Sequence, residues 1–156
     1  MPIRKGDKAP SFELACQPGE TVNLADYLGR EKIVLLFFPL CYSPVCTTEM
    51  CTLRDSWDHW KNLNAKVFGL SVDSPFVTAR FRADEKIPFP LLSDFNKEVT
   101  AEYGVLYEEL RGFKGVSKRA AFVIGTDGLV HYAWVTDNSG DQPEYEQVRN
   151  AVAQAP

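Results

Sequence analysis

The sequence predicts an α/β protein with a central mixed β-sheet flanked by helices. Two apolar runs, Ile33–Phe38 and Lys66–Val72, have the length and composition of buried strands. A helical pattern lies between them, so the three segments form a strand–helix–strand unit that is expected to be parallel and right-handed. Later, two further apolar strands are joined by a short glycine-containing connection, which predicts an antiparallel pair. Parallel and antiparallel pairs in one chain indicate a mixed sheet.

The length and charge of the chain bear on its domain number and on the partners it could bind. The chain has 156 residues, which favours one domain over residues 1–156, and its formal net charge is −4 with scattered basic residues. Nucleic acid is therefore an unexpected partner. The N-terminus lacks an apolar signal core, and no apolar run is long enough to span a bilayer, so no membrane association and a cytoplasmic location are expected. In that compartment thiols stay reduced unless they take part in a reaction.

The N-terminal part of the chain predicts a β-hairpin extension. Phe12 and Leu14 alternate with polar neighbours, and Val22 and Leu24 repeat this pattern. Pro18–Gly19 between them is typical of a turn. We therefore expect two short antiparallel strands ahead of the first buried strand.

The helix after Ile33–Phe38 has a clear start signal. The hydroxyl of Ser43 is predicted to accept a hydrogen bond from a free backbone N–H, and Pro44 suits the first helical position. Apolar residues recur at steps of three and four, and they extend the predicted helix to about Asn64. These residues are Met50, Leu53, Trp57 and Trp60.

The rest of the chain completes the predicted order of elements. Ser74 and Pro75 predict the start of a second helix, which runs to about Glu85. The later predicted elements are the strand Leu91–Leu92, the helix Lys97–Tyr103, the loop Leu106–Gly115, the strands Lys118–Ile124 and Leu129–Val135, the loop Asp137–Asp141 and the helix Tyr145–Ala153. This order fits a thioredoxin-like fold.

Cys46 is the leading candidate for a reactive residue. It falls in the first turn of the helix that begins at Pro44, where free N–H groups and the helix dipole stabilise an anion. That helix starts at the carboxyl end of a buried strand, where open α/β sheets place their ligands. Cys41 and Cys51 lie five residues before and five after Cys46. A thiolate with two thiols nearby indicates redox chemistry.

These residues resemble the active-site pattern of the peroxiredoxin family, which is Pro-x-x-x-Thr/Ser-x-x-Cys. Here the pattern reads Pro39, Ser43 and Cys46, and the family's glutamate three residues later matches Glu49. The Cys-x4-Cys spacing to Cys51 is similar to the PrxQ (bacterioferritin-comigratory) branch, with an AhpE-like branch as the alternative. Cys41 departs from the family pattern, since a cysteine is not expected at that position.

The resemblance implies a thiol-dependent peroxidase. Its substrate would be hydrogen peroxide or an organic hydroperoxide, and a thioredoxin or similar dithiol would reduce the oxidised enzyme. It implies neither a cofactor nor a metal. A monomer or a homodimer is expected, because dimers through the active-site loops are common in the family.

The resemblance also assigns roles to individual residues. Cys46 would be the peroxidatic nucleophile, and the hydroxyl of Ser43 would contact the sulfur or the peroxide. Arg119 matches the family's active-site arginine, and an arginine entering a buried strand needs an anionic partner in any case. Glu49 would fix this arginine, and Pro39 would shield the thiolate from water.

The identity of the resolving thiol stays open at this point. Attack on peroxide leaves Cys46 as a sulfenic acid, and Cys51 is the first candidate to condense with it. On an intact helix these two Cα atoms stand roughly 8 Å apart, whereas a disulfide requires less than about 7 Å. The first turns of the helix must therefore unwind before this bond forms. Cys41 is the rival, and an external thiol is the third alternative.

Two other classes of protein share some of these features. A thiol-disulfide oxidoreductase of the thioredoxin fold also carries a cysteine at a helix start, but its usual Cys-x-x-Cys motif is absent here. A metal-binding module would use Cys41, Cys46 and Cys51 as ligands. Four-residue spacers are unusual for zinc, and neither His59 nor His131 lies close in sequence.

Overall fold

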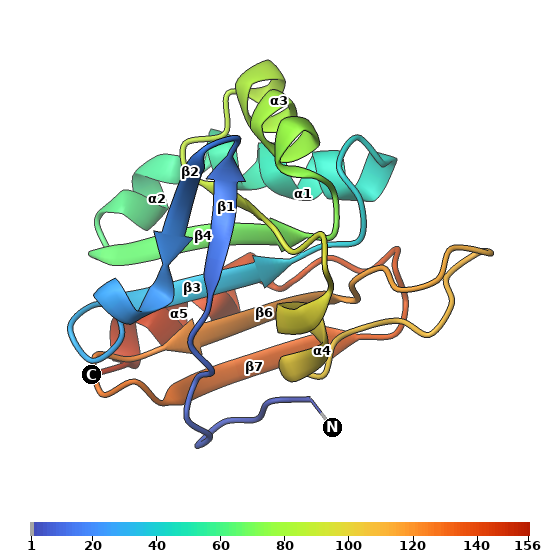
Figure 1. Cartoon of the computed structure of the whole chain (residues 1–156). Helices are drawn as coiled ribbons and strands as arrows, with labels where there is room; N and C mark the ends of the chain where they lie inside the picture. Colours follow the sequence, from blue (N-terminus) through green and yellow to red (C-terminus); the bar gives the residue numbers. More distant parts are fainter. Residues whose placement is uncertain (1) are drawn as a thin grey trace.

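The computed structural model describes residues 2–156, and a seven-stranded sheet forms its centre (Figure 1). The strands are β1 (Glu13–Gln17), β2 (Glu20–Asn23), β3 (Lys32–Phe37), β4 (Ala65–Ser71), β5 (Leu91–Ser93), β6 (Arg119–Ile124) and β7 (Val130–Thr136). The helices are a 3-10 turn, η1 (Leu24–Asp26), and α1 (Pro44–Asp55), α2 (Trp57–Lys61), α3 (Pro75–Glu85), α4 (Glu98–Glu102) and α5 (Tyr145–Gln154).

The sheet is mixed, as the sequence predicts, with the strand order β2-β1-β5-β4-β3-β6-β7. The central strand β3 pairs parallel with β4 and antiparallel with β6. The expected parallel strand–helix–strand unit is therefore confirmed. The N-terminal hairpin is also present, and because β1 pairs with β5 it continues the same sheet at one edge.

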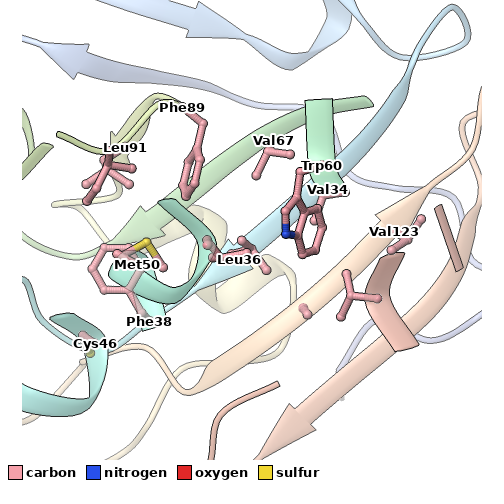
Figure 2. Close-up of a cluster of buried hydrophobic side chains, with 14 of the residues drawn as sticks. Val34, Leu36, Phe38, Cys46, Met50, Trp60, Val67, Phe89, Leu91 and Val123 are labelled. Atoms are coloured by element: carbon pink, nitrogen blue, oxygen red, sulfur yellow. The ribbon is translucent and has the colours of Figure 1, made fainter. Parts of the chain in front are cut away.

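The alternation of side chains along β3 builds two cores on opposite faces of the sheet. Val34 and Leu36 face a cluster that includes residues of α1, α2, α3 and α5. Leu35 and Phe37 face the other cluster, which is covered by η1 and by residues in and beside α4. In Figure 2 Cys46 lies at the margin of the first cluster. The thiol is therefore built into the edge of a packed core, where it is shielded from water.

The prediction of one helix from Pro44 to Asn64 was wrong. The chain forms α1 and α2, and Ser56 separates them with its backbone outside the helical region. The hydroxyl of Ser56 donates a hydrogen bond of 2.8 Å to the Thr52 carbonyl. Such local bonds compete with regular helical hydrogen bonding. Trp57 and Trp60 therefore lie on α2, beyond the end of the helix that carries Cys46.

Ser43 holds the predicted position before α1, but the predicted hydrogen bond of its hydroxyl was wrong. The hydroxyl donates to the Leu40 carbonyl at 2.7 Å and caps no backbone N–H. By contrast, Ser74 does accept a hydrogen bond from the Val77 N–H at the start of α3. The loop before α1 thus uses the hydroxyl of Ser43 to stabilise its own turn.

The loop that follows α4 differs in detail from expectation. The predicted loop Leu106–Gly115 contains two isolated bridges, Leu106 with Ser117 and Leu110 with Phe113, so it folds back on itself. Within residues 2–156, none of the helices combines the length and the apolar character that crossing a bilayer requires.

Replacing Gly69 with alanine should destabilise the fold. A Cβ at this position in β4 would stand 2.6 Å from Leu91 Cδ2 and 3.3 Å from Phe38 Cε1, and both neighbours are buried. We expect a loss of about 1–3 kcal/mol in the free energy of unfolding, as is typical of overpacked cores. Urea denaturation measures it. Gly140→Ala is the control, because only the exposed side chain of Asn138 comes close there. Equal stability of the two variants would contradict this packing argument.

Candidate functional site

The loop between β3 and α1 is tied to the carboxyl edge of the sheet. The backbone N–H of Cys41 donates a hydrogen bond of 2.8 Å to the Asp73 carboxylate, which lies just beyond the end of β4. Tyr42 adopts a positive φ of 67°, a conformation that non-glycine residues rarely take. These constraints fix where α1 begins, and so they fix the position of Cys46 in its first turn.

Arg119 contacts the Cys46 sulfur with both ends of its guanidinium. Nη1 and Nη2 each stand 3.3 Å from Sγ. Both side chains are 1% exposed, so water competes little with this contact. β6 pairs with β3 so that Ala120 lies opposite Phe37, and Arg119 therefore comes just past the end of β3. Two charged donors on one sulfur stabilise the thiolate.

Two further acceptors hold the same guanidinium. Nη1 donates to Glu49 Oε1 at 2.8 Å, and Nη2 donates to the Ser139 carbonyl at 2.9 Å. Glu49 lies one turn after Cys46 on α1, whereas Ser139 follows β7. The guanidinium is thus fixed between a helix and a loop, with its charge directed at the sulfur.

The carboxyl group of Glu49 is fully buried, and this determines its charge. Burial raises the pKa of Glu49 to about 7, although the Arg119 guanidinium opposes that shift. Within residues 2–156, its second oxygen, Oε2, has no hydrogen-bond partner. Burial also acts to lower the pKa of Arg119, but Glu49 and Cys46 more than offset this effect and raise it overall. Arg119 therefore stays charged, and near pH 7 the protonated fraction of Glu49 leaves positive charge available to the thiolate.

A cavity of about 400 Å³ opens beside this cluster. Arg119, Ser43 and Pro39 line it, so three of the predicted site residues share one space. The other lining residues are mostly apolar: Leu40, Pro44, Val45, Leu110, Arg111, Phe113, Ser139 and Gly140. A small molecule in the cavity would meet the side chains of two arginines, Arg111 and Arg119, and otherwise a mostly apolar lining.

The other cysteines near Cys46 face different partners. The four cysteines of the described chain are free thiols. Cys41 is buried with its sulfur 3.8 Å from Ser71 Oγ, and burial together with Asp73 raises its pKa. Cys51 is partly exposed and its thiol donates to Glu85 Oε2 at 3.3 Å; burial and this carboxylate raise its pKa. The thiols of Cys41, Cys46 and Cys51 thus contact Ser71, Arg119 and Glu85 respectively, and in this conformation they do not gather around a common point as metal ligands would.

The structure brings together most of the residues that the sequence singles out. Cys46, Glu49 and Arg119 are in direct contact, and Ser43 and Pro39 line the adjoining cavity. Cys41 and Cys51 are near in sequence but are bonded elsewhere. The Ser139 carbonyl and the Leu110–Phe113 segment were not predicted from the sequence. A backbone carbonyl carries no residue-type signal, and only Gly112 marks that segment as a turn.

Comparison with known proteins adds to this geometry. A family model described as the AhpC/TSA family matches residues 5–133. The chain belongs to this family. Among curated relatives, peroxiredoxin Bcp of Escherichia coli K12 is 36% identical over 136 residues, covering 85% of this chain and 86% of the relative. The chloroplastic 2-cysteine peroxiredoxin of Chattonella marina var. antiqua is 36% identical over 163 residues, covering 98% of this chain and 81% of that protein.

A solved structure agrees with these relatives. The crystal structure of peroxidoxin BcpB from Mycobacterium tuberculosis superimposes with a TM-score of 0.84 at 31% identity, covering 96% of each chain. The thioredoxin-like peroxiredoxin fold is therefore confirmed, and the similarities are consistent with the PrxQ branch. This peroxiredoxin is a thiol-dependent peroxidase.

The raised pKa of Glu49 predicts a pH dependence of stability. Its pKa lies near 7 in the folded protein against an ordinary value of 4.5, so the folded state binds the proton more tightly. This stabilisation is complete below about pH 4.5 and is lost as the pH rises through 7. Over that range wild type should lose about 3 kcal/mol relative to Glu49→Gln, which has no proton to release. Urea denaturation between pH 4.5 and 8 measures both proteins. Parallel pH profiles would contradict the assignment.

Proposed function

We propose that Cys46 is the peroxidatic nucleophile of this enzyme and that Arg119 is its activating cation. The observation that carries the proposal is the pair of 3.3 Å contacts from Nη1 and Nη2 to the Cys46 sulfur in a water-poor site. A thiolate, not a thiol, attacks peroxide. The contacts favour the thiolate before substrate arrives.

The first reaction is a displacement at oxygen. The thiolate of Cys46 donates an electron pair to one peroxide oxygen, the O–O bond breaks, and the second oxygen leaves as hydroxide or alkoxide. Cys46 becomes a sulfenic acid, and the leaving oxygen takes a proton to give water or an alcohol. Arg119 contributes here as well, because its fixed charge stabilises the negative charge that develops on the leaving oxygen.

Ser43 and Pro39 act as positioning groups in this proposal. The Ser43 hydroxyl donates a hydrogen bond to the Leu40 carbonyl, so the lone pairs of its oxygen are available to accept a hydrogen bond from the peroxide. Pro39 lines the same cavity and offers no N–H, so it limits water at the thiolate. Glu49 holds the guanidinium in place through its 2.8 Å contact.

We propose Cys51 as the resolving thiol. Its thiol attacks the Cys46 sulfenic acid, a disulfide forms, and the hydroxyl leaves with a proton as water. Cys51 is partly exposed and shares α1 with Cys46, whereas Cys41 is buried in the loop before that helix. The partial exposure and the shared helix favour Cys51. Because the two positions are too far apart on an intact helix, α1 must first unwind locally.

The disulfide requires an external reductant to close the cycle. We propose a thioredoxin or similar dithiol, which would reduce the Cys46–Cys51 bond by thiol–disulfide exchange. The peroxiredoxin relatives support this class of partner. The net reaction consumes one peroxide and one dithiol and releases water, with a second water or an alcohol from the peroxide.

A single-turnover peroxide titration tests the assignment of Cys46. Reduced wild type should consume one equivalent of peroxide, whereas Cys46→Ser should consume none. Arg119→Met should react at least about a hundredfold more slowly, because the thiolate and the leaving oxygen both lose their cation. Cys16→Ser is the matched control and should behave as wild type, since the Cys16 thiol donates to the Glu20 carbonyl within the N-terminal hairpin. Peroxide consumption by Cys46→Ser would refute the proposal.

Separate substitutions identify the resolving thiol. After one equivalent of peroxide, Cys51→Ser should accumulate a Cys46 sulfenic acid that a dimedone probe captures, whereas Cys41→Ser should still form the Cys46–Cys51 disulfide. Mass spectrometry of the intact protein distinguishes the two products. A stable sulfenic acid in Cys41→Ser together with a disulfide in Cys51→Ser would show that Cys41, not Cys51, is the resolving thiol.

A further inference from the structure

The end of α3 contacts the segment around Cys46 from both sides. Glu85 Oε2 accepts a hydrogen bond of 3.3 Å from the Cys51 thiol on α1. Asp84 Oδ2 accepts one of 2.7 Å from the hydroxyl of Tyr42, in the loop before α1. These neighbouring carboxylates therefore hold both flanks of the segment that must unwind before a disulfide forms. Nothing in the peroxide step requires them.

Arg54 strengthens the link between the two helices at Glu85. Its Nη1 donates to the Glu85 carbonyl at 2.7 Å and stands 3.6 Å from Glu85 Oε2. The Glu85 side chain is 29% exposed and that of Arg54 is 33% exposed. The contacts are thus near enough to the surface to break and re-form without opening the core.

We propose that Glu85 is a positioning residue that restrains Cys51 in the folded conformation and so limits the rate at which the Cys46–Cys51 disulfide forms. The inference rests on the proposed function, and it goes further by assigning a residue to the resolving step. While Cys51 stays bonded to Glu85, the Cys46 sulfenic acid persists and remains open to a second peroxide. Once that bond breaks, Cys51 is free to reach Cys46.

The negative charge on Glu85, like its hydrogen bond, slows the reaction of the Cys51 thiol with the Cys46 sulfenic acid. Burial and the adjacent carboxylate both raise the pKa of the Cys51 thiol, so the neutral, less reactive thiol is favoured beside Glu85. Glu85 therefore holds the resolving thiol back and does not activate it.

Tyr42 and Asp84 supply the second anchor of the same segment. Tyr42 combines an exposed ring with a positive φ of 67°, and its ring packs against Phe81 of α3 with a centroid distance of 4.9 Å. Loss of its hydroxyl contact leaves the strained backbone with one fewer restraint. Loss of the hydrogen bond between Tyr42 and Asp84 should therefore speed disulfide formation, as should loss of the bond between Cys51 and Glu85.

The competing fates of the sulfenic acid provide the measurement. In the resolving step Cys51 forms an S–S bond with Cys46 and water leaves. In the competing step the O–O bond of a second hydrogen peroxide breaks, one oxygen passes to the sulfenic acid to give a sulfinic acid, and the other leaves as water. Faster resolution lowers the sulfinic fraction at a fixed excess of peroxide. Rapid acid quenching of the full-length protein after addition of hydrogen peroxide, followed by mass spectrometry, counts sulfenic, disulfide and sulfinic forms against time.

Glu85→Ala should form the disulfide about fivefold faster than wild type and give a correspondingly smaller sulfinic fraction, because one net hydrogen bond contributes about that factor. Glu85→Gln keeps an acceptor without the charge and should fall between the two proteins. Tyr42→Phe should accelerate resolution in the same direction. Asp58→Ala is the matched control: it removes an exposed carboxylate that pairs only with Lys61 on α2, and it should match wild type.

Disulfide formation in Glu85→Ala at the wild-type rate, or more slowly, would overturn the inference. Far-ultraviolet circular dichroism and the rate of sulfenic acid formation establish that the variant is folded and its site intact. A wild-type protein that forms sulfenic acid but never links Cys46 to Cys51 would overturn this inference and leave the peroxidase assignment standing. A wild-type Cys46 that stays reduced would overturn the proposed function itself.

Discussion

The contact between the Arg119 guanidinium and the Cys46 sulfur is the interaction on which the rest of the site depends. A buried cation is costly unless acceptors surround it, and three groups meet that demand: the Cys46 sulfur, Glu49 and the Ser139 carbonyl. Each comes from an element whose position the sheet sets. The antiparallel pairing of β6 with β3 brings residues 46 and 119 together across a large sequence separation.

Glu49 gives this arrangement its particular electrostatic balance. A fully ionised carboxylate would neutralise much of the field of Arg119, but burial favours its protonated form and raises its pKa to about 7. The guanidinium can therefore act on the sulfur while Glu49 still fixes its position. Glu49 can therefore orient the Arg119 guanidinium through a hydrogen bond even when it carries no negative charge that would weaken the attraction between Arg119 and the sulfur.

Much of the fold was predictable because its signals are local. The apolar run of β3, the Ser-Pro start of α3 and the turn at Pro18–Gly19 each specify their own structure. The break at Ser56 was not predictable, since Trp57 and Trp60 continue the apolar spacing across it. The hydrogen-bond partner of the Ser43 hydroxyl was not predictable either, because its bond to the Leu40 carbonyl depends on the geometry of a loop.

The same distinction applies to the candidate site. Residue type and position in the helix indicated Cys46, and the resemblance to peroxiredoxins indicated Glu49 and Arg119. For Arg119 the cost of burying an unpaired charge pointed the same way. The Ser139 carbonyl contributes through its backbone, which any residue could supply. The Leu110–Phe113 segment lines the cavity only because the chain folds back through the bridges that Leu106 and Leu110 make.

The interruption at Ser56 has a consequence for the size of the region that opens. Because α1 ends there, helical cooperativity need not carry unwinding into α2, and Trp60 can stay seated in the interior of the protein. In the proposed resolving step, the part of the chain that unwinds is then at most about three helical turns, not five.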